Sequence, residues 1–198
     1  MPIFNGQAPQ YVYSANSMPL KSDDKSYNQF MQPELIEETL GDYLAQRGFC
    51  IATAESCTGG LIADRITNIP GSSKYFLGGV VTYSNQAKMK WLDVKTETLA
   101  DYGAVSRAIV EEMALGLAQT LQDIFPPSKL LTIAVSGIAG PDGGTVAKPV
   151  GYVWIAWSFN GLLRVKDFQF QGERSSIKNQ SADQALYGAL KWLQELTS

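Results

Sequence analysis

Residues 49–60 read FCIATAESCTGG, an apolar segment that leads into a polar, glycine-rich turn. Residues 49–54 predict a short buried strand, and residues 61–69 have the apolar spacing of a helix. In open α/β sheets, ligands bind at the carboxyl ends of the strands, so Ser56 would stand where a site is expected. The stretch therefore predicts an α/β fold with a site at this strand-to-helix turn.

The alternation of helices and strands continues on both sides of this junction. We predict further helices over 33–47, 85–92, 107–125 and 175–196, and further strands over 78–83, 130–136, 151–157 and 162–170. The segment 130–136 is apolar enough for a central strand that is buried on both faces. Phe159-Asn160-Gly161, between the last two strands, is a hairpin signal. Together the elements predict a three-layer α/β/α domain with a mixed β-sheet.

Composition and charge argue against several classes of protein. Hydrophobic residues make up 45% of the 198 residues, but no apolar run approaches the ~18–20 residues of a membrane span, and the N-terminus lacks the features of a signal peptide. A net charge of −3 and a pI near 5.0 argue against general nucleic-acid binding. Backbone N–H groups can still hold a small anionic ligand. We expect a cytoplasmic protein that binds neither membranes nor nucleic acid.

The cysteines and the N-terminal region add two expectations. Cys50 and Cys57 form no Cys-x-x-Cys pair and the chain has no histidine, so we expect no zinc site, no other metal and no cofactor. Residues 1–32 are polar and lack periodicity, and we interpret them as an irregular extension of a domain over 33–198. The aromatic residues of this extension can dock on the domain or on a neighbouring subunit, which leaves a homo-oligomer open.

Ser56 is the first candidate for chemistry. Without histidine, neither a Ser-His-Asp triad nor a Cys-His dyad can operate within the chain, and lysine is the base that Ser-Lys enzymes use instead. The N–H groups of Thr58, Gly59 and Gly60 would lie at the helix start, available to an oxyanion or a phosphate. The alternative interpretation is that Ser56 is an ordinary helix N-cap.

A second candidate is the loop 136–144, which reads SGIAGPDGG and follows the predicted central strand. Its glycines permit unusual backbone angles and the close approach of a ligand. The loop matches neither the G-x-G-x-x-G pattern nor the Walker lysine pattern, so neither a dinucleotide fold nor an NTPase is supported. We interpret it as a ligand-binding loop in which Asp142 can bind a ribose hydroxyl or an amine. A tight turn is the alternative.

A third candidate group joins Tyr83 and Lys88, with Arg174 further along the chain. Tyr83 ends a predicted strand, and Asn85 is a natural N-cap for the helix that follows. Lys88 then falls in the first turn, where the helix dipole disfavours a cation, and it can project toward the same sheet edge. To act as a base its pKa must fall from ~10.4 to about 7–8. The alternatives are a solvated lysine and, for Arg174, a surface residue instead of a phosphate or carboxylate ligand.

These motifs, in this order, resemble the CinA C-terminal domain family, whose stand-alone members are the PncC-type nicotinamide-nucleotide amidohydrolases. The matching segments span the chain from about Pro33 to its end, and residues 1–32 lie outside the resemblance. The segments are 54–60 (AESCTGG), 70–73 (PGSS), 81–85 (VTYSN) with Lys88, 103–106 (GAVS), 136–144 (SGIAGPDGG) and 148–151 (KPVG). Several such segments in a fixed order are more specific than any one alone.

The resemblance implies hydrolysis of the carboxamide of nicotinamide mononucleotide to nicotinic acid mononucleotide and ammonia, a step of pyridine nucleotide salvage. It implies that Ser56 is the nucleophile, Lys88 the base and Tyr83 part of the proton network. The candidates that it implies for the ribose and the phosphate are Ser136, Gly137, Gly140, Asp142 and Arg174. One alternative is a non-catalytic nucleotide-binding module, and another is an interaction protein that assembles through residues 1–32.

Overall fold

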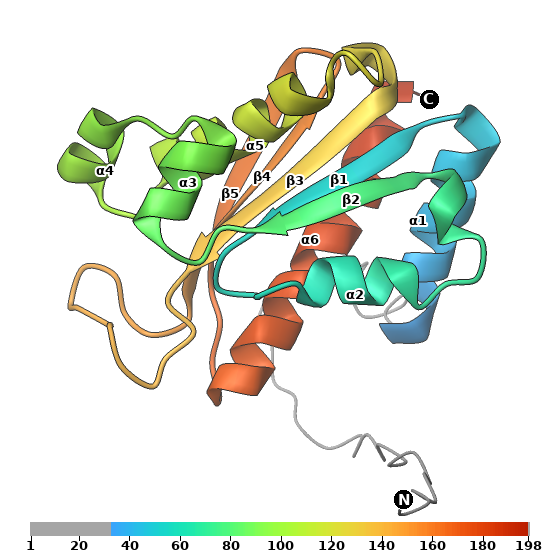
Figure 1. Cartoon of the computed structure of the whole chain (residues 1–198). Coiled ribbons are helices and arrows are strands. Elements are labelled where there is room, and N and C mark those ends of the chain that lie inside the picture. The colour runs from blue at the N-terminus through green and yellow to red at the C-terminus, as the bar shows by residue number, and fades with distance from the viewer. Residues whose placement is uncertain (1–32, 198) are drawn as a thin grey trace, which may run out of the picture. The chain divides into compact units, whose positions relative to one another are not determined.

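Five strands form one mixed sheet at the centre of the fold, in the order β2-β1-β3-β4-β5 (Figure 1). The computed structural model describes residues 33–197, so the predicted extension over 1–32 lies outside the described residues. The parallel strands are β1 (Cys50–Glu55), β2 (Phe76–Val81) and β3 (Leu130–Gly137). The hairpin strands β4 (Tyr152–Phe159) and β5 (Leu162–Gln169) continue the sheet in antiparallel pairing. The predicted mixed sheet is confirmed.

Helices cover both faces of this sheet, which confirms the three-layer prediction (Figure 1). One face carries α1 (Pro33–Arg47), α2 (Leu61–Thr67) and α6 (Arg174–Thr197). The other carries α3 (Asn85–Leu92) and α5 (Arg107–Leu121), with α4 (Thr96–Tyr102) packed on α5. Short 3-10 turns, η2 (Ser72–Lys74) and η3 (Pro127–Lys129), precede β2 and β3.

The size of the side chains on each face of the central strands determines how closely the helices on that face pack against the sheet. On the face covered by α1, α2 and α6, the strands present large side chains such as Ile51, Ile133 and Trp157. On the other face they present small ones, including Ala54 and Ala134. Because alanine leaves space above the sheet, α5 packs close to the strands and α3 reaches the sheet edge where β1 ends.

Several predicted boundaries differ from the structure, and one helix was not predicted. Strand β2 begins at Phe76 and ends at Val81, two residues before the predicted strand at each end. Helix α5 ends at Leu121, because residues 122–125 turn back on its last carbonyls instead of continuing the helix. Helix α4 was not predicted: none of its seven residues is buried, so it leaves no apolar periodicity.

The connections that leave β1 and β2 run over opposite faces of the sheet. The connection from β1 to β2 runs through α2 on one face, and the connection from β2 to β3 runs through α3 and α5 on the other. The connections therefore diverge between the carboxyl ends of the neighbouring strands β1 and β2, which is where open α/β sheets form a binding crevice. Among residues 33–197, no helix has the length and apolarity that a membrane crossing requires.

Candidate active site

Polar residues lie side by side where the three parallel strands end. The Ser56 amide donates to Val135 O at 3.0 Å, and the Thr82 amide donates to Glu55 O at 2.8 Å. Glu55, the last residue of β1, pairs with Val81, the last residue of β2, and with Val135, two residues before the end of β3. The sheet register therefore brings Ser56, Thr82 and Ser136 to one edge.

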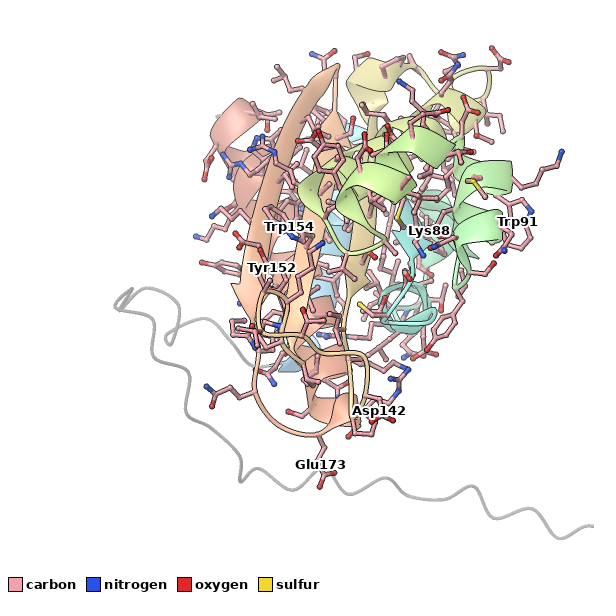
Figure 2. The ribbon with its side chains drawn as sticks, turned by 90° about the vertical axis from the view of Figure 1, so that its left-hand side faces the viewer. Lys88, Trp91, Asp142, Tyr152, Trp154 and Glu173 are labelled. Carbon is pink, nitrogen blue, oxygen red and sulfur yellow. The ribbon has the colours of Figure 1, made fainter. Side chains whose placement is uncertain are left out.

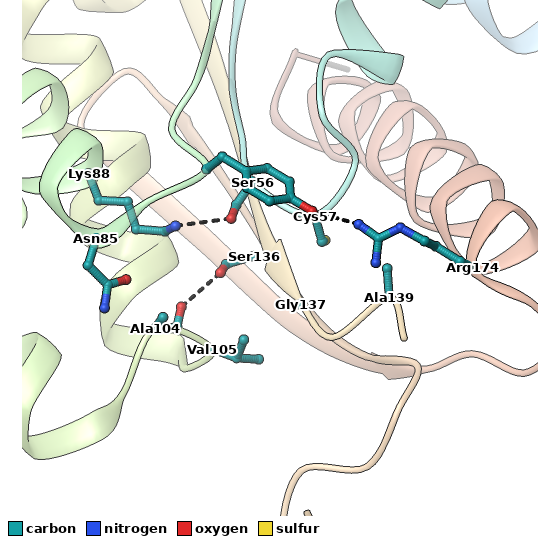
Figure 3. A pocket seen from close by; sticks show the side chains of 11 residues that line it. Ser56, Cys57, Asn85, Lys88, Ala104, Val105, Ser136, Gly137, Ala139 and Arg174 are labelled. Carbon is teal, nitrogen blue, oxygen red and sulfur yellow. Dashed lines mark hydrogen bonds between the residues drawn. The ribbon is translucent and has the colours of Figure 1, made fainter. Parts of the chain in front are cut away.

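Lys88 and Ser56 form a hydrogen-bonded pair at this edge (Figure 3). Lys88 Nζ lies 3.0 Å from Ser56 Oγ and donates to Thr82 O at 2.8 Å. Lys88 is only 1% exposed and Ser56 only 8%, so both groups are largely withdrawn from solvent. The alternative of a solvated lysine is wrong.

The surroundings of Lys88 favour its neutral amine. Burial lowers the pKa of the Lys88 ammonium below its ordinary value of 10.5, and a smaller interaction with Cys57 acts in the opposite direction. Among the described ion pairs, none includes Lys88. Burial also raises the pKa of the Cys57 thiol to about 12, so this thiol is protonated at neutral pH and supplies no countercharge. A neutral Lys88 can accept the hydroxyl proton of Ser56.

Helix α3, which carries Lys88, begins differently from the prediction. The N-cap is Ser84 and not Asn85, because Ser84 has extended backbone and its Oγ accepts from the Ala87 amide at 3.1 Å. Asn85 is already the first helical residue, and its side chain lines the pocket beside Lys88 (Figure 3). The helix start therefore contributes an amide group to the site.

The carboxylate that binds the start of α2 belongs to Glu55. Its oxygens accept from three backbone amides at 2.9 to 3.1 Å, those of Gly60, Ile62 and Ala63. Glu55 is buried, and these bonds tie the turn that contains Ser56 to the end of β1. The interpretation of Ser56 as an ordinary N-cap is wrong, because its hydroxyl bonds to Lys88 instead of a helix amide.

Two of the three amides predicted to face an oxyanion have partners inside the chain. Gly59 N donates to Ser56 O at 3.1 Å, and Gly60 N donates to Glu55 at 2.9 Å. Within the described residues, the Thr58 amide has no oxygen acceptor, and its backbone hydrogen bond goes to the Cys57 thiol. Of the three amides predicted to bind an anion at residues 58–60, only that of Thr58 is therefore left without an oxygen acceptor.

Replacing Glu55 with glutamine is expected to lower the free energy of unfolding by about 2 kcal/mol, because hydrogen bonds to a charged group are worth roughly 1.5–3 kcal/mol. The amide NH₂ of glutamine would also face backbone N–H donors where Glu55 presents only acceptors. Urea unfolding would measure the change. The matched control is Glu97→Gln at an exposed position of α4, expected to change stability by less than about 0.5 kcal/mol. Equal effects of the two substitutions would contradict the role of Glu55.

A pocket of about 220 Å³ lies over the Ser56–Lys88 pair (Figure 3). Cys57 and, from the loop before α5, Ala104 and Val105 form apolar parts of its wall. Within residues 33–197, no three His, Cys, Asp or Glu side chains are grouped so that they could hold a metal ion. The pocket can hold a small group with one polar end at Ser56.

The structure brings Ser136 and Gly137 to this pocket in different ways. Ser136 Oγ donates to Ala104 O at 2.8 Å, so it holds the loop that forms one wall, and its lone pairs can still accept a hydrogen bond. Gly137 has no room for a side chain, since a Cβ atom there would lie 2.5 Å from Val153. Both residues shape the pocket.

Tyr83 and Arg174 both line the pocket, and their side chains are hydrogen-bonded to each other. Arg174 Nη2 donates to Tyr83 Oη at 2.6 Å, and Arg174 Nη1 donates to Gly140 O at 2.5 Å. Tyr83 is 61% exposed and follows β2, whereas Arg174 begins α6. Gly140 thus contributes a carbonyl that orients the guanidinium, and it does not itself line the pocket.

Asp142 is not brought to the pocket. It is exposed, does not line the pocket, and lies far from Lys88 in the loop between β3 and β4 (Figure 2). The base of this loop is closed by a bond from Gly151 N to Ile138 O at 2.7 Å, which leaves its tip in solvent. The predicted contact between Asp142 and a ribose or amine therefore has no support in this geometry.

The model of one protein family, described as the CinA C-terminal domain, matches residues 33–193. The chain belongs to the CinA C-terminal domain family. Among curated relatives, a CinA-like protein of Syntrophomonas wolfei is 51% identical over 144 residues, which are 72% of this chain and 33% of that protein. A CinA-like protein of Kosmotoga olearia is 45% identical over 153 residues, 77% of this chain and 36% of that protein. The chain spans about a third of the length of the curated relatives it matches.

Solved structures of CinA proteins have the same fold. A CinA superfamily protein of Klebsiella pneumoniae has a TM-score of 0.77 and 33% identity, and the match covers 83% of this chain and 99% of that one. The competence/damage inducible protein CihA of Agrobacterium tumefaciens has a TM-score of 0.74 and 38% identity, with 80% and 93% covered. The mixed five-stranded sheet with helices on both faces is thus the fold of CinA superfamily proteins.

Sequence reasoning missed three residues that build this CinA-family site. Glu55 precedes Ser56 directly, and an acid just before a helix that lacks a capping side chain was an available signal. Asn85 was assigned to a cap, which concealed its place in the pocket wall. Cys57 carried no signal of its own, because its contribution to the wall depends on how the turn at Ser56 is folded.

Proposed function

We propose that this chain hydrolyses the carboxamide of nicotinamide mononucleotide to nicotinic acid mononucleotide and ammonia, with Ser56 as nucleophile and Lys88 as base. One observation carries the proposal: a buried lysine amine, which forms no ion pair with a described carboxylate, lies 3.0 Å from a serine hydroxyl in a pocket. A structural lysine would gain more from a countercharge or from solvent. The membership of the CinA C-terminal domain family and the motif resemblance support the same substrate class.

In the first half-reaction, the neutral Lys88 amine takes the proton of Ser56 as Oγ attacks the carboxamide carbon. The carbonyl oxygen becomes an oxyanion, for which the Thr58 amide is the donor without an oxygen acceptor among the described residues. Lys88 then returns the proton to the leaving nitrogen, which departs as ammonia. The product of this step is an ester between Ser56 and the nicotinoyl carbon.

In the second half-reaction, Lys88 is again neutral and can remove a proton from a water molecule that attacks the ester. Collapse of the second tetrahedral intermediate releases the carboxylic acid, and Lys88 returns the proton to Ser56 Oγ. Thr82 O holds the Lys88 amine throughout, because it accepts one of the amine N–H bonds at 2.8 Å. One lysine can therefore serve both steps without a histidine.

Tyr83 and Arg174 line the pocket, and we assign them to substrate positioning. Tyr83 Oη accepts from Arg174 and keeps its own proton free to donate to a substrate or a leaving group. This donor role is the part of the proton network that the resemblance attributes to Tyr83. Ser136, which holds the Ala104 wall, is assigned to the shape of the pocket and can accept one hydrogen bond from the ligand.

The test is release of ammonia and formation of nicotinic acid mononucleotide by the purified full chain, followed by a coupled assay and by chromatography. We expect turnover of nicotinamide mononucleotide and none of asparagine, whose carboxamide is not on an aromatic ring. The alternative function is a binding module. It would be supported if calorimetry detects binding of the mononucleotide while no ammonia is released, and this outcome would overturn the amidase proposal.

A further inference from the structure

A second, larger pocket adjoins the candidate active site. It measures about 660 Å³ and shares Ala139 and Arg174 with the catalytic pocket, so the two are neighbours. The catalytic pocket, at about 220 Å³, is below the roughly 300–1,000 Å³ of typical ligand pockets. Because the two pockets share Ala139 and Arg174, a substrate longer than one ring can extend from Ser56 past Arg174 into the second pocket.

Cations dominate the region of these two pockets, although the chain as a whole is acidic. Arg174 and Lys178 both line the second pocket, and their i, i+4 spacing places them on one face of α6. The only carboxylate among the residues that line either pocket is Glu173, whose side chain points away from the body of the domain (Figure 2). Two neighbouring cations without a facing acid form a site for an anion.

Lys178 is the cation whose donors are free. Two nitrogens of Arg174 already donate to Gly140 O and Tyr83 Oη. Lys178 is half-buried, and its Nζ makes no hydrogen bond or ion pair with another described residue. A Cβ atom built on Gly59 would lie 3.7 Å from this Nζ, so the ammonium stands beside the turn that carries Ser56.

We propose that Lys178 holds the phosphate group of a nucleotide in the second pocket and thereby makes this site select a nucleotide over the corresponding nucleoside. This inference rests on the proposed function, since it assigns one end of the same substrate. An ammonium group and a phosphate attract each other through charge-assisted hydrogen bonds, which neutral donors in the pocket cannot replace. The nucleoside has no group for Lys178 to bind.

The test compares nicotinamide mononucleotide with nicotinamide riboside as substrates of wild type and Lys178→Met. We expect KM for the mononucleotide to rise about 10- to 100-fold, with kcat changed less than about threefold, because a charge-assisted bond is lost. For the riboside, both KM and kcat are expected to change by less than about threefold. Lys178→Arg should retain most of the selectivity. The matched control is Lys74→Met. Lys74 is an exposed lysine of η2 at the opposite edge of the sheet, so KM and kcat should stay unchanged for both substrates.

A binding measurement separates failure of this inference from failure of the proposed function. Calorimetry on Ser56→Ala, with and without Lys178→Met, would use nicotinic acid mononucleotide and its riboside as probes. Loss of mononucleotide binding alone supports the role of Lys178, even if wild type releases no ammonia. Equal losses for both probes, no loss for either, or no mononucleotide binding to Ser56→Ala would overturn it, whatever the ammonia assay gives.

Discussion

Ammonia release from nicotinamide mononucleotide is expected to fall by at least about 10³-fold when Lys88 is replaced by methionine, and by a similar factor in Ser56→Ala. Each variant removes one end of the 3.0 Å contact through which the proton moves. The double variant is expected to be no slower than the slower single variant, because residues that act as one unit are not additive. If the rate loss of the double variant equals the product of the two single losses, the residues act independently, and this would contradict a Ser-Lys pair.

The pH profile of the wild-type rate gives a second measurement of the same pair. Proton transfer from Ser56 needs neutral Lys88, so kcat/KM should rise with pH through the pKa of Lys88 in the free enzyme and then level off. Burial lowers this pKa, so the midpoint of the rise should lie below pH 10.5. The residual activity of Lys88→Met should not show this rise with pH. If the rate of Lys88→Met still rises with pH in the same way, the group that titrates is not Lys88.

The stability of Lys88→Met is expected to change in the opposite direction from its activity. Because the pKa of Lys88 is lower in the folded state than in the unfolded chain, the folded state binds fewer protons between the two values, and unfolding free energy rises with pH across that window. At lower pH the folded protein bears the full penalty of a buried ammonium. Methionine removes that penalty, so urea unfolding at neutral pH should give an equal or higher free energy for Lys88→Met.

Lys90→Met is the matched control for this comparison, since Lys90 lies exposed on the same helix. It is expected to leave both the rate and the stability nearly unchanged. A strong loss of stability in Lys88→Met would mean that the bonds of Lys88 to Thr82 and Ser56 outweigh its desolvation. In that case the fall in rate could not be attributed to lost proton transfer.

Local patterns predicted most of the fold because each element carries its own signal. The strand 130–136 is apolar over its whole length, and the structure gives β3 as Leu130–Gly137 with almost every residue buried. Ser106 was predicted to cap the long helix, and its Oγ accepts from Ile109 N at 3.4 Å. The strand-to-helix junction at Ser56 likewise follows from sequence, because the order of apolar segment, turn and helix is contained in twelve residues.

The site was harder to predict because its contacts join distant segments. The partner of Arg174 is Tyr83, 91 residues away, and no local pattern indicates that these residues meet. Asp142 was selected for its residue type within a glycine-rich loop, but the direction of that loop depends on the bond between Gly151 and Ile138 at its base. The burial of Lys88 is also a tertiary property, since α3 must first pack against α5.

The packing of α3 against α5 gives the second large effect, which we expect from Gly116→Ala. A Cβ atom at Gly116 of α5 would lie 1.9 Å from the backbone oxygen of Leu92, the last residue of α3. A backbone carbonyl cannot swing aside as a side chain does, so the two helices must separate. We expect unfolding free energy to fall by about 3 kcal/mol, although alanine is the better helix former.

The same displacement should reach catalysis, because α3 carries Lys88. A shift of about 1 Å at Nζ is expected to slow ammonia release by roughly 10²-fold in the fraction that remains folded. Urea unfolding and kcat, measured at a temperature where the variant is fully folded, separate the two effects. The matched control is Gln119→Ala on the exposed face of α5, where the alanine methyl group faces solvent. Its unfolding free energy and kcat should both stay close to those of wild type. Normal kcat in a destabilised Gly116→Ala would mean that Lys88 is positioned by Thr82 O alone and not by the packing of its helix.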